Sequence, residues 1–229
     1  MVFFEESVFF GVVLSLLAYG AGTLIQRKWK LAILNPLLIA VVIVIVFLVV
    51  CHIDYGTYEH GAQYISYLLT PATVSLAIPL HRQFTLLKKN LAAVMAGIVS
   101  GVVVSLVSIT VLAALFHFSR SEWITFLPKS VTTAIGMGIS EELGGYASIT
   151  AAVIILSGIF GNICAGWICR LFHITDPIAK GVGIGSASHA IGTTKAMEMG
   201  EVEGAMSSLS LVVSGVLTVI GAAVIVQIL

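Results

Sequence analysis

The chain has 229 residues, of which 59% are hydrophobic and 10% are charged, with a mean hydropathy of +1.09 and a formal net charge of zero. Soluble domains carry roughly 25% charged residues, so this composition indicates a protein that crosses a membrane several times. Zero net charge argues against nucleic acid as a partner, because that contact needs clustered excess lysine and arginine. The expected partner is the lipid bilayer itself.

The apolar residues lie in continuous runs, which predicts spanning helices rather than strands. A helix that rises ~1.5 Å per residue needs about 20 residues to cross ~30 Å of hydrocarbon, whereas spanning strands alternate in polarity. We predict an all-α, polytopic membrane protein with about seven to eight transmembrane or re-entrant helical segments. The runs lie at residues 7–25, 31–50, 62–80, 91–116, 127–140, 146–171, 177–197 and 205–229.

Proline residues that follow capping side chains indicate where helices begin. Asn35-Pro36 and Asp176-Pro177 each pair an N-cap side chain with proline in the first helical turn. Thr70-Pro71 has the same form, but it lies in the middle of an apolar run. The helix in that run is therefore predicted to be broken or kinked.

The basic residues predict the orientation of the chain in the membrane. Six of the eleven fall in two loops, the first with Arg27, Lys28 and Lys30 and the second with Arg82, Lys88 and Lys89. Such loops stay on the cytoplasmic side. The next basic loop, with Arg170 and Lys180, is cytoplasmic only if residues 127–140 form a re-entrant hairpin, which suits their short length. Residues 7–25 are expected to be a retained helix, because acidic rather than basic residues precede them.

Each half of the chain contains one interrupted apolar segment, at residues 68–80 and 183–196. With one re-entrant element between them, these segments run in opposite directions. Paired broken helices in inverted repeats are typical of transporters whose site lies at the bilayer midplane. We therefore predict a single integral membrane domain over residues 1–229, with repeat-like halves at residues 31–116 and 127–229.

Between Lys180 and Glu203 the chain is small and polar, although long apolar runs flank it. Polar groups at membrane depth are costly and usually functional. On an uninterrupted helix, one face would carry the residues that recur at steps of four and three: Gly181, Gly185, Ser188, Gly192 and Lys195. This face fits either close helix packing, as also expected of the GxxxG pair Gly97 and Gly101, or a helix break where backbone N–H groups and hydroxyls bind a small anion.

His189 has three interpretations, as a proton acceptor, a hydrogen-bond donor to a substrate, or an imidazole that only packs between helices. Glu198 follows Lys195 by three residues, so the two side chains can pair on one helix. Glu198 is also a candidate for carrying a coupled proton.

A second polar cluster, LPKSVTTAIGMGISEELGG, surrounds Lys129. A lysine in the first turn of a helix opposes the helix dipole, so a negative group beside it would be stabilising. A transported carboxylate would serve, and so would Glu141 or Glu142. Motifs of soluble and intramembrane enzymes are absent from the sequence, and the glycines of GVGIGS miss the dinucleotide-binding spacing, so no enzyme activity is expected.

The predicted substrate-binding residues come from all of these segments: Asn35, Thr70, Pro71, Thr73, Lys129, Ser130, Thr132, Thr133, Ser186, Ser188, His189, Gly192, Thr193 and Lys195. His189 and Glu198 are the proton-coupling candidates. No catalytic residue, metal or cofactor is expected.

Four blocks of sequence carry a family resemblance: NPLLIA at 35–40, LLTPATVSLAIPL at 68–80, LPKSVTTAIGMGIS at 127–140 and KGVGIGSASHAIGTTKAMEMGEVEGAMSSLS at 180–210. Together they resemble the LrgB/CidB family of antiholin-like membrane proteins, which is also related to the C-terminal half of the plastidal glycolate/glycerate translocator. The likeness covers nearly the whole chain. Thr70 stands where relatives often carry glycine, and Ala134 stands where they often carry proline.

The resemblance implies two functions. One is secondary transport of small 2-hydroxy or 2-keto monocarboxylates such as glycolate, glycerate or pyruvate. The other is regulation of murein hydrolase activity and cell lysis together with a small membrane partner of the LrgA/CidA type. It also implies a multi-pass protein of the bacterial inner (cytoplasmic) membrane that forms a homo-oligomer such as a dimer.

The residue pattern favours transport, because a cationic, hydroxyl-rich hairpin opposite a broken helix suits an anion. In the predicted mechanism, a carboxylate near the midplane accepts hydrogen bonds at the helix breaks and is balanced by Lys129 or Lys195. Movement of one repeat against the other would then expose the site to either side. Control of lysis would follow indirectly from carboxylate traffic.

Overall fold

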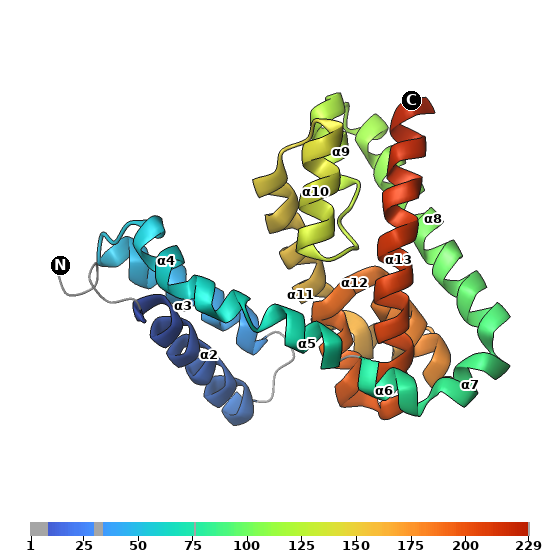
Figure 1. Ribbon diagram of the computed structural model, residues 1–229, viewed down its shortest axis with the longest axis horizontal. Helices are drawn as coiled ribbons and strands as arrows, with labels where there is room; N and C mark the ends of the chain where they lie inside the picture. Colours follow the sequence, from blue (N-terminus) through green and yellow to red (C-terminus); the bar gives the residue numbers. More distant parts are fainter. Residues whose placement is uncertain (1–8, 30–33, 76, 229) are drawn as a thin grey trace. The chain divides into compact units, whose positions relative to one another are not determined.

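The computed structural model describes residues 9–29, 34–75 and 77–228. All regular elements in these residues are helices, which confirms the predicted all-α fold (Figure 1). Their contacts divide the chain into two compact units, Met1–Ser75 and Leu76–Leu229. In the described part of the chain, four helices are long and apolar enough to cross a membrane: α2 (Phe10–Trp29), α8 (Leu91–Leu115), α11 (Ala147–Leu171) and α13 (Glu201–Ile228). The protein is therefore a multi-pass membrane protein, whereas the predicted single domain with repeat-like halves stays a prediction.

The first unit contains α2 (Phe10–Trp29), α3 (Pro36–Val50), α4 (Tyr55–Ser66) and α5 (Leu69–Ser75). The predicted start of α3 is confirmed, because Asn35 Oδ1 accepts hydrogen bonds from the backbone N–H groups of Leu37 at 2.9 Å and Leu38 at 3.3 Å. Helix α4 packs against α2 through a hydrogen bond of 2.8 Å between the hydroxyls of Ser15 and Tyr58.

The predicted interruption near Pro71 is present, but it lies a few residues earlier. Helix α4 ends at Ser66, and α5 begins at Leu69, so the proline is the third residue of α5. Proline is tolerated in a first turn because its missing N–H would have no partner there. The break is therefore made in the two residues before α5 rather than by the proline ring.

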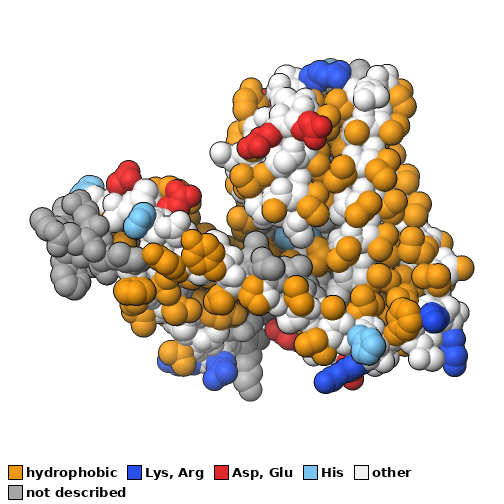
Figure 2. Space-filling model, viewed as in Figure 1, with side chains coloured by type: hydrophobic (Ala, Val, Ile, Leu, Met, Phe, Trp, Pro, Cys, Tyr) orange, Lys and Arg blue, Asp and Glu red, His pale blue; other side chains and the backbone are white. Residues whose placement is uncertain are grey.

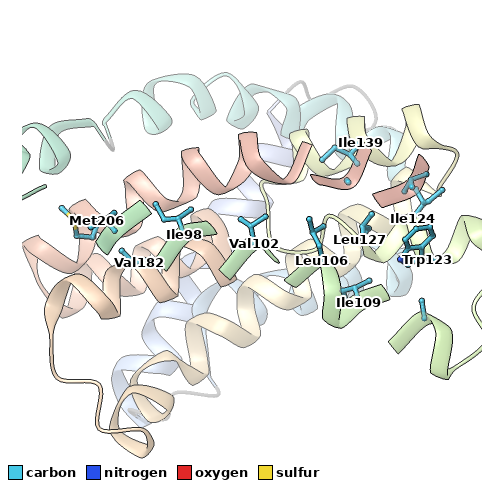
Figure 3. Packing of buried hydrophobic residues seen from close by; sticks show 14 of the residues in the cluster. Ile98, Val102, Leu106, Ile109, Trp123, Ile124, Leu127, Ile139, Val182 and Met206 are labelled. Atoms are coloured by element: carbon cyan, nitrogen blue, oxygen red, sulfur yellow. The ribbon is translucent and has the colours of Figure 1, made fainter. Parts of the chain in front are cut away.

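The second unit contains two short helices followed by six elements that enclose its core: α6 (Ala77–Arg82), α7 (Phe84–Lys89), α8 (Leu91–Leu115), α9 (Arg120–Phe126), α10 (Thr133–Leu143), α11 (Ala147–Leu171), α12 (Pro177–Met199) and α13 (Glu201–Ile228). One face of α8 is buried along its length and packs against Val182, Met206 and Trp123 (Figure 3). Apolar side chains cover most of the visible outer surface of this unit, and charged side chains lie toward its ends (Figure 2). A lipid-facing exterior of this kind fits the assignment to a membrane.

Helices α9 and α10 form a re-entrant hairpin. At its base, Arg120 Nη2 donates a hydrogen bond of 2.6 Å to the carbonyl of Val226, near the end of α13. At its tip, the hydroxyls of Ser130 and Ser105 lie 3.0 Å apart, and Ser157 Oγ donates to the carbonyl of Lys129 at 2.7 Å. Ser105 is the fifteenth of 25 residues in α8, and Ser157 is the eleventh of 25 in α11. The tip, residues 127–132, therefore lies about halfway along the spanning helices.

The hairpin predicted at residues 127–140 is present but longer, because its first arm begins at Arg120. Lys129 lies at the tip rather than at one end. Glu141 and Glu142 lie near the other end of α10, about 12 Å farther along by helical rise, so they do not pair with the tip.

Helix α12 is a second hairpin, folded at Ser188 and His189, whose backbone angles are not helical. In its first arm, Gly181 and Gly185 approach Glu203 and Ser207, so this arm runs parallel to α13. The order reverses in the second arm, where Thr193 Oγ1 lies 2.9 Å from Ser207 Oγ and Met197 approaches Gly204. The arm therefore runs back, antiparallel to α13.

The prediction that the small residues between 181 and 195 share one helix face is wrong, because it assumed an uninterrupted helix. Gly192 faces Ile184 of the opposite arm and Ser188 at the fold, so it packs inside the hairpin. Gly181 and Gly185 pack against α13 instead. Small residues thus allow close backbone approach on two different faces.

Both arms of α12 open toward one end of the second unit, and α9 and α10 lie toward the other end (Figure 1). The end at α12 carries six lysine and arginine residues: Arg82, Lys88, Lys89, Arg170, Lys180 and Lys195. The other end carries Arg120. By the positive-inside rule, the basic end is expected to face the cytoplasm. The two hairpins therefore enter the membrane from opposite sides.

Candidate functional site

The tips of the two hairpins share a cavity of about 390 Å³ against α8. The first hairpin contributes Lys129 and Ser130, and α12 contributes Gly183, Ser186 and Ala187. Helix α8 supplies a face of small and hydroxyl-bearing residues: Gly97, Ser100, Gly101, Val104, Ser105 and Ser108. Polar side chains from three elements thus meet where the two hairpins end.

A second cavity, of about 400 Å³, lies between α11 and the first arm of α12. Near the hairpin tips it is lined by Lys129, Ser157 and Ser188, and at the basic end by Ala179 and Lys180. Its α11 wall is formed by Phe160, Gly161, Ala165, Ile168 and Cys169. Lys129 lines both cavities, and the described residues around them include no aspartate or glutamate.

Lys129 is an unusual cation for its depth in the membrane. Its Nζ donates to Ser130 Oγ at 3.1 Å, and among the described residues no carboxylate lies within 4.0 Å of it. An ammonium group has three N–H donors, so two remain for another acceptor. A charge at this depth is costly unless water or a counter-ion solvates it. The arrangement suits a small anion held beside the ammonium.

His189 ties the fold of α12 to α11. Its Nε2 lies 2.9 Å from the carbonyl oxygen of Ile154, and because a carbonyl only accepts, this nitrogen donates the hydrogen bond. The backbone of His189 has φ 42° and ψ −141°, a conformation that favours glycine. The side chain is buried and lines neither cavity. The geometry is that of a structural tie, and its proton-coupling role stays a prediction.

Two substitutions at His189 should separate the cost of its strained backbone from the stabilisation that its side-chain hydrogen bond provides. His189→Ala keeps the strained backbone and loses the ring, so we expect the free energy of unfolding to fall by about 1–3 kcal/mol. His189→Gly loses the same bond but relieves the backbone strain, so its loss should be smaller. Thermal unfolding of detergent-purified protein measures both. If His189→Gly were no more stable than His189→Ala, the argument for backbone strain at this position would be contradicted.

The remaining predicted residues of the second unit lie away from the cavities. Lys195 Nζ pairs with Glu198 Oε2 at 2.8 Å, and both side chains are partly exposed in the second arm of α12. Thr193 Oγ1 donates to the carbonyl of His189 at 2.9 Å and serves the hairpin. Thr132 is the N-cap residue of α10, and Thr133 is the first residue of that helix.

The predicted residues of the first unit lie at the start of α3 and in α5. Asn35 is the cap of α3, and Pro71 is exposed in α5. The side chains of Thr70 and Thr73 lie outside the described residues. The structure therefore brings together Lys129, Ser130 and Ser186 in one cavity, and Lys129 and Ser188 in the other.

Sequence reasoning missed Ser105, Ser157 and Lys180. The serines lie in long apolar helices, where a single hydroxyl carries no motif. The small residues of α8 recur at steps of three and four, a pattern that could have predicted a cavity-lining face. Gly97 and Gly101 were instead predicted to serve helix packing alone. They do pack, since added Cβ atoms would lie 3.0 Å from Val182 and from Ser186, and they also line the cavity.

Comparisons with known proteins find a matching family model and relatives that share one name. The model of the LrgB-like family matches residues 15–228. The chain is 37% identical over 224 residues to the antiholin-like protein LrgB of Bacillus subtilis (strain 168), with 97% of each chain covered. It is 38% identical over 213 residues to proteins of the same name from Bacillus mycoides (strain KBAB4) and Bacillus cereus (strain B4264), with 93% of each chain covered. No solved structure matches it. The chain therefore belongs to the LrgB-like family.

Proposed function

We propose that this protein is an antiholin-like regulator of cell lysis in a bacterial cytoplasmic membrane. The support is that relatives matching 93–97% of the chain carry the name antiholin-like protein. These names favour regulation over the transport predicted from the residues, which rests on the site geometry alone. As the family resemblance implies, the proposed partner is a small membrane protein of the LrgA/CidA type, and the proposed assembly is a homo-oligomer.

Gene deletion in the source organism tests this proposal. Loss of the protein is expected to change the rate of autolysis and the murein hydrolase activity in the medium, and re-expression is expected to restore both. Autolysis that stays the same in the deletion strain, with and without the gene for the small membrane partner, would count against a regulatory role.

One observation favours a second candidate function, which is passage of small monocarboxylates such as glycolate or pyruvate. That observation is the position of Lys129. It lies where two opposed hairpins meet, its side chain lines both cavities, and it has no carboxylate partner among the described residues. Hairpins that enter from opposite sides and end near the midplane are an arrangement in which a site can be exposed to either face. The other hydroxyls of the cavities donate to backbone carbonyls, so the further donors beside the lysine are Ser188 and one hydroxyl of the Ser105–Ser130 pair.

Uptake by purified protein in liposomes tests the second candidate. Labelled glycolate or pyruvate should enter these vesicles faster than protein-free vesicles, and excess unlabelled carboxylate should compete. Uptake no faster than in empty vesicles, with or without the small partner, would leave regulation as the function.

A further inference from the structure

We infer that the cavity between α11 and the first arm of α12 is a vestibule that admits small monoanions from the cytoplasmic side. Lys180 stands at its mouth and Lys129 at its inner end. The inference deepens the proposed transport function, on which it rests, by assigning the side of access and the residues that select charge.

The cavity extends from the cytoplasmic end of the helices to the hairpin tips. Ile174 and Ala179 precede or begin α12, and Ile168 and Cys169 are near the end of α11, whereas Ser188 is at the fold of α12. From Lys180 to Ser188 the helix rises about 12 Å, which is close to half of the ~30 Å hydrocarbon thickness. The cavity therefore covers roughly the cytoplasmic half of the membrane.

The charges on the described wall of this cavity all have one sign. Lys129 and Lys180 are its charged lining residues, and neither has a carboxylate within 4.0 Å among the described residues. Low-dielectric walls strengthen the field of a charge inside a cleft. An anion is attracted along the vestibule, whereas a cation is repelled at both ends.

The lining also limits the size and chemistry of the ligand. A volume of about 400 Å³ holds a small organic acid with water, and the wall between the two lysines is mostly apolar. Ser157 and Ser188 also line this cavity, and the Ser157 hydroxyl donates to the carbonyl of Lys129 at 2.7 Å. A monocarboxylate with a short carbon chain matches this distribution, because its charged end can meet Lys129 while its carbon atoms contact the wall.

Gly183 gives a place to probe the vestibule without disturbing it. It lines both cavities, and a Cβ added there meets nothing within 4 Å. We would replace Cys51, Cys164 and Cys169 and introduce Gly183→Cys into the full chain. Thr175→Cys, in the exposed loop before α12, is the matched control outside the cavity. Ala187→Cys, exposed at the same tip, is the second probe if the first variant does not fold.

The measurement compares anionic and cationic methanethiosulfonate reagents in membrane vesicles of known orientation. We expect Gly183→Cys to react from the cytoplasmic side, at least about tenfold faster with the anionic reagent after normalisation to Thr175→Cys. Lys129→Gln and Lys180→Gln should each lower this preference. Pyruvate or glycolate should slow the reaction, whereas neutral glycerol should not.

Three results would overturn the inference: equal rates with both reagents, reaction only from the outer side, or no effect of either lysine substitution. The outcome is separable from that of the uptake assay. Anion-selective, carboxylate-protected labelling without uptake would keep the vestibule and reject transport. Uptake without anion-selective labelling would keep transport and reject this route.

Discussion

Lys129→Ala is expected to lower the initial rate of carboxylate uptake in liposomes by about 10- to 100-fold. The substitution removes the ammonium group on which both cavities converge. Hydrogen bonds to charged groups contribute about 1.5–3 kcal/mol, and each 1.4 kcal/mol corresponds to about tenfold in rate. Lys129→Arg, which keeps the positive charge, should retain more of the uptake.

Lys195→Ala is the matched control for that experiment. Lys195 was predicted to serve the same site, but its ammonium group pairs with Glu198 and lines neither cavity. Because partly exposed ion pairs contribute little, we expect uptake within about twofold of the unsubstituted protein. Equal loss in both lysine variants would show that the assay reports general damage, and unchanged uptake in Lys129→Ala would contradict the assigned site.

Gly185→Ala is expected to destabilise the protein by about 1–3 kcal/mol. An added Cβ at this position would lie 2.8 Å from Ser207 Cα and closer still to its carbonyl oxygen. These are backbone atoms, so the first arm of α12 and α13 must move apart to accept the methyl group. Thermal unfolding in detergent measures the loss.

Gly183→Ala, two residues away in the same arm, is the control. Its Cβ would enter open space, and alanine favours a helix over glycine by about 0.5–1 kcal/mol. The midpoint of unfolding should therefore stay the same or rise. If Gly185→Ala were as stable as Gly183→Ala, the close parallel packing of α12 on α13 would be wrong.

Much of the helix pattern could be predicted because local chemistry fixes it. Apolar runs of spanning length became α8, α11 and α13. The predicted cap at Asp176 is present, since its Oδ1 accepts from the backbone N–H of Ala179 at 2.8 Å, with proline in the first turn. The short run after Phe126 correctly predicted a re-entrant element, because its length did not suit a span.

The sequence predicted an interruption within residues 183–196, which the structure confirms, but it did not predict that the chain reverses there. The fold occurs at Ser188 and His189, and the positive φ belongs to a histidine rather than to one of the nearby glycines. Long-range contacts hold this conformation, above all the bond from the imidazole to Ile154, 35 residues away. Local preferences mark the segment only as a weak helix, since glycine, serine and threonine are poor helix formers, and do not select the residue at which the chain turns.

Three short helices lie wholly or partly in segments between the predicted apolar runs: the first half of α4, all of α7 and all of α9. Helix α9 had a usable pattern, since Ser119 and Glu122 form a capping box in which each side chain bonds to the other residue's backbone N–H. A search for that motif would have placed the first arm of the hairpin correctly.

Within the site, the sequence identified the charged residue Lys129 but not the residues that surround it. Lys129 and Ser130 stood out because polar residues in apolar segments are costly. Lys195 stood out for the same reason, yet it lies near the membrane edge, where Glu198 neutralises it. Depth in the membrane depends on where α12 reverses, and that is a tertiary property.

The central claim is that two hairpins enter from opposite sides and meet at Lys129. The most direct test labels two variants of a chain without other cysteines, Thr175→Cys just before α12 and Glu198→Cys near its end. The reagent is a membrane-impermeant thiol reagent, applied to vesicles of known orientation. Both positions are exposed. We predict that both react from the cytoplasmic side only. Reaction of Glu198→Cys from the outer side would mean that α12 crosses the membrane, and the meeting of the hairpin tips would be contradicted.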